Sequence, residues 1–220
     1  MPYYHYFLGF DTSAAHCAAA LLRGTQVIDS RLEEMSKGQA ERLMPMIEEM
    51  LAAQGLAWAD LAAIGVGIGP GNFTGVRIAV SAARGLALSL GIPAIGVSLF
   101  DARALGLPRP LAVIEDALRG EVYVQIYREE GVTDAPQLVP LAEAAEAARG
   151  MALTGTGAEA AYALAFDAVN LDEDRGLPLA VAIAQIAEAR RLTPQPRPAP
   201  LYLRAADAAP PSEPAPTNQP

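Results

Sequence analysis

The amino-acid sequence predicts an α/β protein with two lobes, and three observations support this prediction. Short apolar runs alternate with helical periodicity over residues 3–105, in the order strand, strand, strand, helix, strand, helix, strand. Two prolines flanking Arg109 then stiffen the chain and prevent a helix from continuing. A shorter series of strands and helices follows over residues 111–190. We therefore expect a first lobe at 1–107 and a second at 108–204.

The composition indicates a folded, acidic protein. Apolar types make up 52% of the 220 residues and charged types 19%, which excludes a chain that is disordered, collagen-like or coiled-coil throughout. Asp and Glu number 25 against 16 Lys and Arg, so the formal charge of −9 disfavours an extended nucleic-acid surface.

The sequence also indicates where the protein is located and which part of it is disordered. The N-terminus shows no targeting segment, and no apolar stretch reaches the ~20 residues that a membrane span needs. We therefore expect a cytoplasmic protein without a membrane anchor. Half of the 18 prolines fall after position 193, and we expect residues 205–220 to be disordered.

Three short apolar runs open the first lobe as strands: Tyr3–Asp11, Cys17–Leu22 and Val27–Leu32. The glycine-containing link Arg23-Gly24-Thr25 is typical of a hairpin turn, so the second and third strands are predicted to pair antiparallel.

Three helices and two further strands complete the first lobe. Apolar residues recur at three and four over Gln39–Gln54, which predicts a helix. A short strand, Leu61–Ile68, leads through a glycine turn into a second helix, Thr74–Leu90. A further strand and a short helix follow at Ile92–Val97 and Ser98–Leu105.

The second lobe has the pattern of a shortened repeat of the first. Leu111–Asp116 and Glu121–Tyr127 are predicted to form a hairpin, because apolar residues alternate along the second of them. Alanine-rich helices over Leu141–Ala148 and Leu179–Arg190 flank a buried strand, Ala152–Thr156. The last of these helices is free to pack back on the first lobe.

The glycine-rich segment Gly65–Arg77 is the most informative. A glycine turn before a helix directs backbone N–H groups towards the helix N-terminus, where an anion such as phosphate is favoured. The spacing fits neither a dinucleotide fingerprint nor a P-loop, because Asn72 stands where the first needs glycine and no Lys follows Gly75. Alternatively, the glycines only permit a tight turn and close packing, with Asn72 or Thr74 as the N-cap.

The end of the first strand offers a second part of such a site. Asp11-Thr12-Ser13 could hold a metal-bound phosphate, or could simply form a turn through side-chain hydrogen bonds to the backbone. Together with the glycine turn it defines a candidate degenerate phosphate or nucleotide site, made of Asp11, Thr12, Ser13, Gly69, Gly71, Asn72 and Thr74.

Histidine and cysteine provide no catalytic pattern. His5 and His16 lie in no paired arrangement that would place two metal ligands on one helical face. Cys17 follows His16 within a strand, so the two side chains point to opposite faces and form no nucleophile–base pair. The single cysteine makes no internal disulfide and is expected to be a small buried hydrophobe. We predict no catalytic residue and no protein-held metal.

The helix Thr74–Leu90 is apolar nearly all round, apart from the stripe Arg77, Ser81 and Arg84. Such a helix is covered on most sides, either by the lobe's own sheet and neighbouring helix or by another subunit. The second alternative gives a candidate partner interface made of Leu43, Met46, Ile47, Met50, Gly75, Arg77, Ala79, Ala82, Ala83 and Leu86.

Six segments resemble one bacterial family in their order and spacing: residues 9–13, 41–47, 69–77, 120–123, 155–157 and 202–204. The Gly-Pro-Gly-x-Phe-Thr-Gly-Val-Arg element is highly specific, and the match extends from residue 6 to about 204. On these motifs the sequence is similar to the TsaB family, also called YeaZ.

The resemblance implies two lobes of the actin, Hsp70 and sugar-kinase type, built like ribonuclease H. It implies a non-catalytic, complex-forming subunit in threonylcarbamoyl transfer to the adenosine next to the anticodon. The implied partners are TsaD, bound through helices of the first lobe, and the ATPase TsaE, with a homodimer when the chain is alone. ATP and a divalent metal then belong to partner subunits, this chain needs no cofactor of its own, and tRNA is reached only through the complex.

The sequence departs from the family pattern at two places. Many members have His where this chain has Gln39, and Arg where it has Leu118. The chain also lacks the His-x3-His pair with which TsaD holds its metal.

The sequence leaves two alternative functions to consider. A small-molecule kinase of the same fold would need intact ATP sites in both lobes, against which the short second lobe argues. A peptidase would need a nucleophile–base pair, and the sequence offers none.

Overall fold

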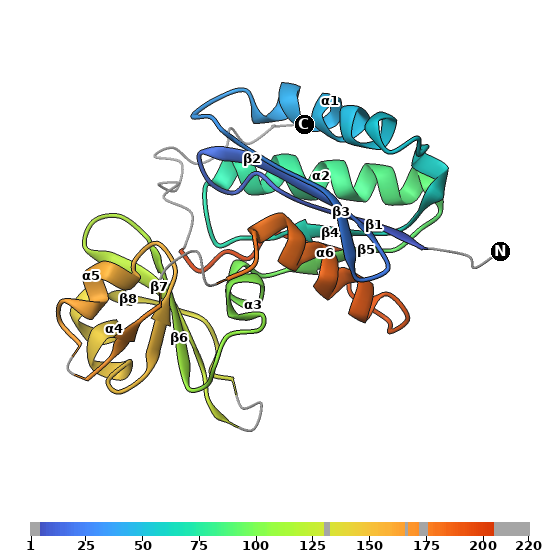
Figure 1. The fold of residues 1–220 in the computed structure, drawn as a ribbon. Helices are drawn as coiled ribbons and strands as arrows, with labels where there is room; N and C mark the ends of the chain where they lie inside the picture. The colour runs from blue at the N-terminus through green and yellow to red at the C-terminus, as the bar shows by residue number, and fades with distance from the viewer. Residues whose placement is uncertain (1–4, 130–132, 166, 172–175, 205–220) are drawn as a thin grey trace, which may run out of the picture.

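The computed structural model describes residues 5–129, 133–165, 167–171 and 176–204 (Figure 1). The chain forms two five-stranded sheets, with helices packed against each. The predicted two-lobed α/β class is confirmed. The expected disorder of 205–220 concerns residues outside the described part of the chain.

The first sheet has the order β3-β2-β1-β4-β5. Its strands are β1 (Tyr6–Asp11), β2 (His16–Arg23), β3 (Gln26–Glu34), β4 (Leu61–Gly67) and β5 (Ala94–Val97). β2 and β3 pair antiparallel across a tight turn, so the predicted hairpin is confirmed. β1 lies between antiparallel β2 and parallel β4, which places its end at the centre of the sheet.

Helices cover both faces of the first sheet (Figure 1). Helices α1 (Gln39–Ala53) and α2 (Phe73–Leu90) pack on one face, and α6 (Leu179–Arg190) packs on the other beside α3 (Leu99–Ala104). Helix α6 approaches closely because β1 and β4 present glycines beneath it. A Cβ at Gly9 would collide with the carbonyl oxygen of Ala180.

The second sheet has the order β10-β9-β6-β7-β8. Its elements are β6 (Leu111–Asp116), β7 (Glu121–Tyr127), β8 (Gln137–Pro140), α4 (Leu141–Ala147), β9 (Ala152–Thr154), α5 (Ala158–Tyr162) and β10 (Val169–Asn170). The predicted β6–β7 hairpin is confirmed. The sequence did not predict β8, α5, β10 or the short 3-10 turn at Trp58–Asp60, because none is long enough to show a period.

Residues 191–204 run from α6 across both lobes. The N–H of Leu201 donates to the carbonyl oxygen of Ile68 in the first lobe at 2.8 Å. Arg204 then donates to the carbonyl oxygen of Ala117 at 2.9 Å and to Glu121 at 2.8 Å, both in the second lobe. The end of the described chain therefore ties the two lobes together.

Helix α2 is long and apolar enough to cross a membrane by length and composition alone, with 18 residues and a mean hydropathy of 1.2. It carries two arginines, Arg77 and Arg84. In the fold it lies in the helical layer and contributes Val76, Val80 and other small apolar side chains to the core.

Candidate functional site

The end of β1 holds a buried carboxylate whose partners come from its own lobe. Asp11 is 1% exposed, and its Oδ1 accepts from the N–H of Ser13 at 2.9 Å and from the Ser13 hydroxyl at 2.8 Å. The Nε2 atom of His16 lies 2.8 Å from the same oxygen. Oδ2 has no hydrogen-bond partner among the described residues and lies against Gly67, where a Cβ would overlap it.

The glycine turn before α2 is packed against this strand end. The hydroxyl of Thr12 donates to the carbonyl oxygen of Gly75 at 2.7 Å, and the N–H of Asn72 donates to the carbonyl oxygen of Ser13 at 2.6 Å. A Cβ at Gly75 would overlap the Thr12 carbonyl, so glycine permits the close packing that the sequence suggested as one alternative. Asn72, the first of the two candidate N-caps, caps α2 by accepting from the N–H of Gly75 at 3.0 Å.

The structure separates the predicted phosphate residues into two groups. Five lie together at the strand end and the turn: Asp11, Thr12, Ser13, Gly71 and Asn72. Gly69 is in the same turn as Gly71 but packs against Val76, and Thr74 is exposed on the first turn of α2.

A cleft of about 390 Å³ lies between the lobes. The first lobe contributes Ser13, Gly71 and Asn72 to it. The second lobe contributes six residues, among them Glu115, Asp116 and Thr156, which the sequence did not single out as site residues. Glu115 and Asp116 stand at the end of β6, as Asp11 stands at the end of β1. This repeated position is the sequence feature that could have identified them as site residues.

Glu115 is the buried acid of this cleft, with 4% of its surface exposed. It accepts from the Thr156 hydroxyl at 2.8 Å and from Nε of Arg103 at 3.1 Å. Burial raises the pKa of Glu115, while Arg103 and Thr156 oppose that shift. With Asp116 beside it, the second-lobe wall of the cleft favours a cationic or hydrogen-bond-donating group over a phosphate.

The remaining titratable candidates are structural. Cys17 is fully buried, as expected, and burial raises its pKa to about 11. His16 pairs with Asp11 instead of with the cysteine. Within the described ranges, no three His, Cys, Asp or Glu side chains come close enough to hold a metal ion.

The candidate partner interface needs a correction. Seven of its ten residues are buried in the core between the sheet and the two helices: Leu43, Met46, Ile47, Met50, Gly75, Ala79 and Ala83. Burial within one chain is therefore the correct alternative for these seven. Arg77 is exposed, and Ala82 and Leu86 are half-buried, so these three remain on the outer side of α2.

An exposed cluster of two rings and a guanidinium lies at the N-terminal end of α2. The Phe73 and Tyr202 rings stack with centroids 5.4 Å apart, and each is 49% exposed. Arg77 lies over the Phe73 ring at 3.7 Å, and its Nε donates to the Tyr202 hydroxyl at 2.8 Å. Both aromatic residues lie in segments that resemble the family, but the sequence did not predict their contact, because they lie far apart in the chain.

The two positions that depart from the family pattern both line the cleft between the lobes. Gln39 donates to the carbonyl oxygen of Met35 at 3.0 Å. Leu118 is 71% exposed and has a φ of 65° in the β6–β7 turn.

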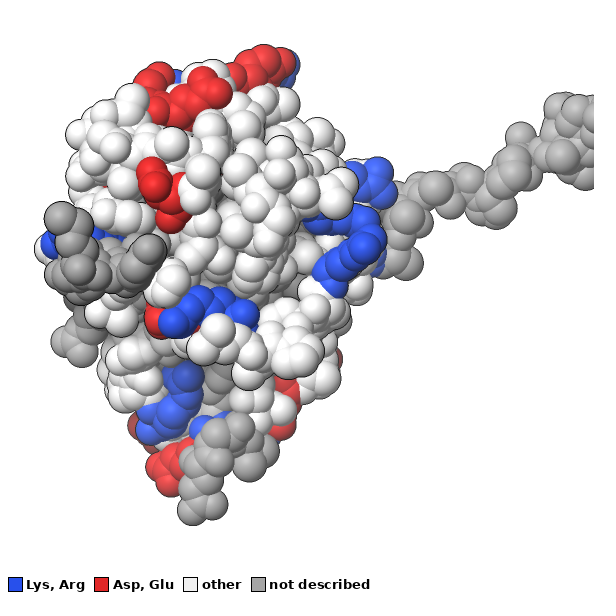
Figure 2. Space-filling model, turned by 90° about the vertical axis from the view of Figure 1, so that its right-hand side faces the viewer, with Lys and Arg blue, Asp and Glu red and all other residues white. Residues whose placement is uncertain are grey.

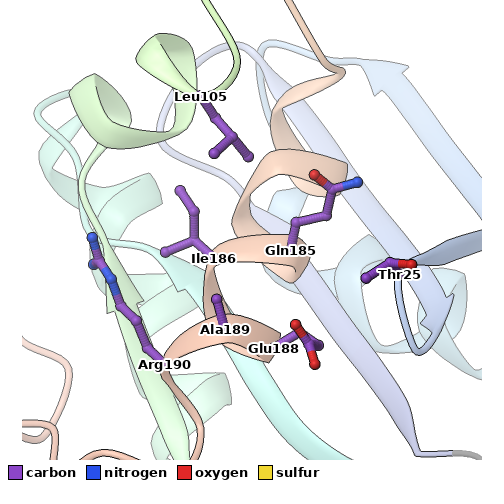
Figure 3. A pocket seen from close by; sticks show the side chains of 7 residues that line it. All are labelled: Thr25, Leu105, Gln185, Ile186, Glu188, Ala189 and Arg190. Atoms are coloured by element: carbon purple, nitrogen blue, oxygen red, sulfur yellow. The ribbon is translucent and has the colours of Figure 1, made fainter.

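A separate cavity of about 360 Å³ lies on α6, between Leu105 and the β2–β3 turn at Thr25 (Figure 3). In Figure 3, Leu105 and Ile186 turn towards each other, whereas Gln185 and Glu188 point elsewhere. None of the residues predicted as a site lines this cavity, and its polar groups do not converge.

Known proteins match this chain over most of its length. The family model described as TsaD: tRNA N6-adenosine threonylcarbamoyltransferase matches residues 31–172. The tRNA threonylcarbamoyladenosine biosynthesis protein TsaB of Escherichia coli is 38% identical over 130 residues, which are 56% of this chain and 55% of that protein. The match thus covers about half the length of that curated relative.

Two solved structures extend the comparison to the fold. YeaZ from Pseudomonas aeruginosa is 30% identical, with a TM-score of 0.72 over 90% of this chain and all of that one. Component A of (R)-2-hydroxyglutaryl-CoA dehydratase from Acidaminococcus fermentans shares the fold alone, at 14% identity and a TM-score of 0.52, over 85% of this chain and 99% of that one. On the sequence matches and the YeaZ structure together, this chain belongs to the TsaB (YeaZ) family.

Proposed function

We propose that this chain acts in the biosynthesis of tRNA threonylcarbamoyladenosine, as a complex-forming subunit without catalysis of its own. Family membership supports the pathway, because the curated relatives that match are named for it. The family model carries the name of the threonylcarbamoyltransferase TsaD, which supports a place beside that enzyme.

One observation carries the non-catalytic part of the proposal. Oδ1 of Asp11 and the Thr12 hydroxyl, which would hold a metal-bound phosphate, are engaged by the chain's own groups. Ser13 and His16 occupy Oδ1 of Asp11, and Thr12 is bonded to Gly75. We therefore assign ATP and any divalent metal to partner subunits, and no cofactor to the chain alone.

The proposed partner is TsaD, bound through the outer side of α2. That side has small and apolar groups at Ala82 and Leu86 next to the cluster of Phe73, Arg77 and Tyr202. Aromatic and arginine side chains dominate binding energy at protein interfaces. TsaE joins this pair, the chain dimerises when alone, and tRNA is reached through the complex in the cytoplasm.

Co-purification with TsaD from the same organism tests the partner. Ala82→Arg should keep the circular dichroism of the parent chain and lose TsaD, because it buries an unpaired charge at the contact. Thr25→Arg is the matched control, since it adds the same charge at the exposed β2–β3 turn and should bind TsaD normally. A folded Ala82→Arg chain that still binds TsaD with unchanged affinity would place the interface elsewhere.

An assay of the pure chain tests the absence of catalysis. With tRNA, ATP and threonylcarbamoyl-adenylate, it should neither hydrolyse ATP nor modify tRNA. Turnover of ATP about tenfold above a blank without protein would favour the alternative of a small-molecule kinase. Cleavage of a peptide substrate would favour the peptidase alternative.

A further inference from the structure

A groove of about 730 Å³ runs along the C-terminal half of α2. One wall is α2 itself, with Arg84 and Leu88. The other wall is the segment that follows α6, with Leu192, Arg197 and the prolines between them. None of the residues predicted for the phosphate site or the partner interface lines this groove.

The groove carries positive charge that the chain itself does not neutralise. Arg84 and Arg197 are exposed, and neither has a carboxylate within ion-pair distance in the described part of the chain. Helix α2 and the segment 191–204 contain no Asp or Glu, although the whole chain has a formal charge of −9. Elsewhere Arg42 and Arg128 do pair with carboxylates.

One part of the surface is mainly basic. Figure 2 shows acidic side chains along the upper rim of one face and a group of basic side chains at its right-hand edge, while both kinds occur lower down. Positive charge left unpaired on an acidic protein complements a negative partner.

Apolar side chains line the same groove. Leu88 is 86% exposed and Leu192 is 84% exposed. Pro194, Pro196 and Pro198 stiffen the wall that faces α2, which lowers the entropy lost when a ligand binds. Exposed apolar surface rimmed by charge is typical of a protein-binding groove.

We propose that this groove binds a short segment of a partner protein that combines glutamate or aspartate with leucine-like side chains. The carboxylates would pair with Arg84 and Arg197, and the apolar side chains would cover Leu88 and Leu192. An RNA strand fits less well, because its phosphates would pair with the two arginines but leave both leucines exposed. This inference goes beyond the proposed role with TsaD and does not depend on it.

Fluorescence anisotropy tests the proposal with a labelled synthetic peptide of about twelve residues made of Glu and Leu. The peptide should bind the full chain, and the affinity should fall as salt rises. A peptide with Gln in place of Glu should bind at least about fivefold more weakly. The double variant Arg84→Glu, Arg197→Glu should weaken binding of the acidic peptide by about tenfold or more.

Two further variants separate charge from apolar contact. Arg149→Glu, on an exposed residue of the second lobe, introduces the same kind of charge reversal and should leave binding unchanged. Leu88→Ser should weaken binding without affecting the melting temperature, because Leu88 lies outside the core. The proposal is overturned if the acidic peptide does not bind, if the double variant binds it as well as the parent chain does, or if oligouridylate binds more tightly.

Discussion

The two lobes place a buried acid at or next to the end of a central strand and surround it differently. β1 and β6 are both central strands, each between an antiparallel and a parallel neighbour, and each ends in acid. Asp11 is held within its own lobe by Ser13 and His16. Glu115 is held by Thr156 of its own lobe and by Arg103 of α3, which packs between the lobes.

The two lobes repeat a central strand with an acidic end, but the acid has a different role in each lobe. In the first lobe the long glycine turn closes over the strand end, so Asp11 does not line the cleft. In the second lobe the turn is shorter, Gly155-Thr156-Gly157, and Glu115 remains in the wall of the cleft. The first acid therefore stabilises one lobe, whereas the second connects the two.

The largest expected effect comes from opening the closed turn of the first lobe. Gly75→Ala should lower the free energy of unfolding by about 3 kcal/mol or more, because its Cβ would overlap the rigid backbone at Thr12. Gly85→Ala is the matched control on the same helix. A Cβ there meets nothing within 4 Å, so it should raise stability by about 0.5–1 kcal/mol. Urea unfolding measures the free energy of unfolding of both variants. Equal values would show that the turn is not tightly packed.

An intermediate effect is expected from breaking one of the contacts between the lobes. Arg103→Met removes the partner of buried Glu115 and should cost about 2 kcal/mol in unfolding free energy. Arg149→Met removes an exposed pair with Glu146 and should change stability by less than about 0.5 kcal/mol. If the two variants melt at the same temperature, the Arg103 pair does not hold the lobes together.

The smallest expected effect is a change of folding stability with pH that is caused by the titration of Glu115. Its folded pKa lies above the ordinary 4.5, so the folded state holds this proton more tightly than the unfolded chain does. The resulting stabilisation is full below pH 4.5 and is lost as pH rises through the folded pKa. Glu115→Gln should lack this loss. Denaturant unfolding from pH 4 to pH 8 measures the unfolding free energies of the parent chain and of Glu115→Gln. If Glu115 titrated normally, the two free energies would change with pH in parallel.

The longer elements could be predicted from sequence because their periods are local. Helix α1 repeats its apolar residues over four turns, and β7 alternates over seven residues. The strand β10 has two residues and α5 has five, so their structure depends on packing rather than on pattern.

The site was predicted in part for a similar reason. Asp11 and the glycine turn stand out locally, and the structure brings most of that set together. The pair of Arg103 with Glu115, and the stack of Phe73 on Tyr202, join residues that only the folded chain places side by side. Apolar periodicity also cannot distinguish a helix face that meets its own sheet from one that meets a partner, which is why the sequence leaves both alternatives open for Met46 and Ala79.

The position of α6 has a consequence for synthesis on the ribosome. The strands of the first sheet are complete at Val97, but the helix that covers one of its faces begins only at Leu179. Translation adds about 5–20 residues per second, so the sheet face that contains Phe7 and Ile95 stays uncovered for roughly 4–16 s before α6 is made. During that interval the nascent first lobe exposes apolar surface that a chaperone can recognise, and a chain truncated before Leu179 would keep it exposed permanently.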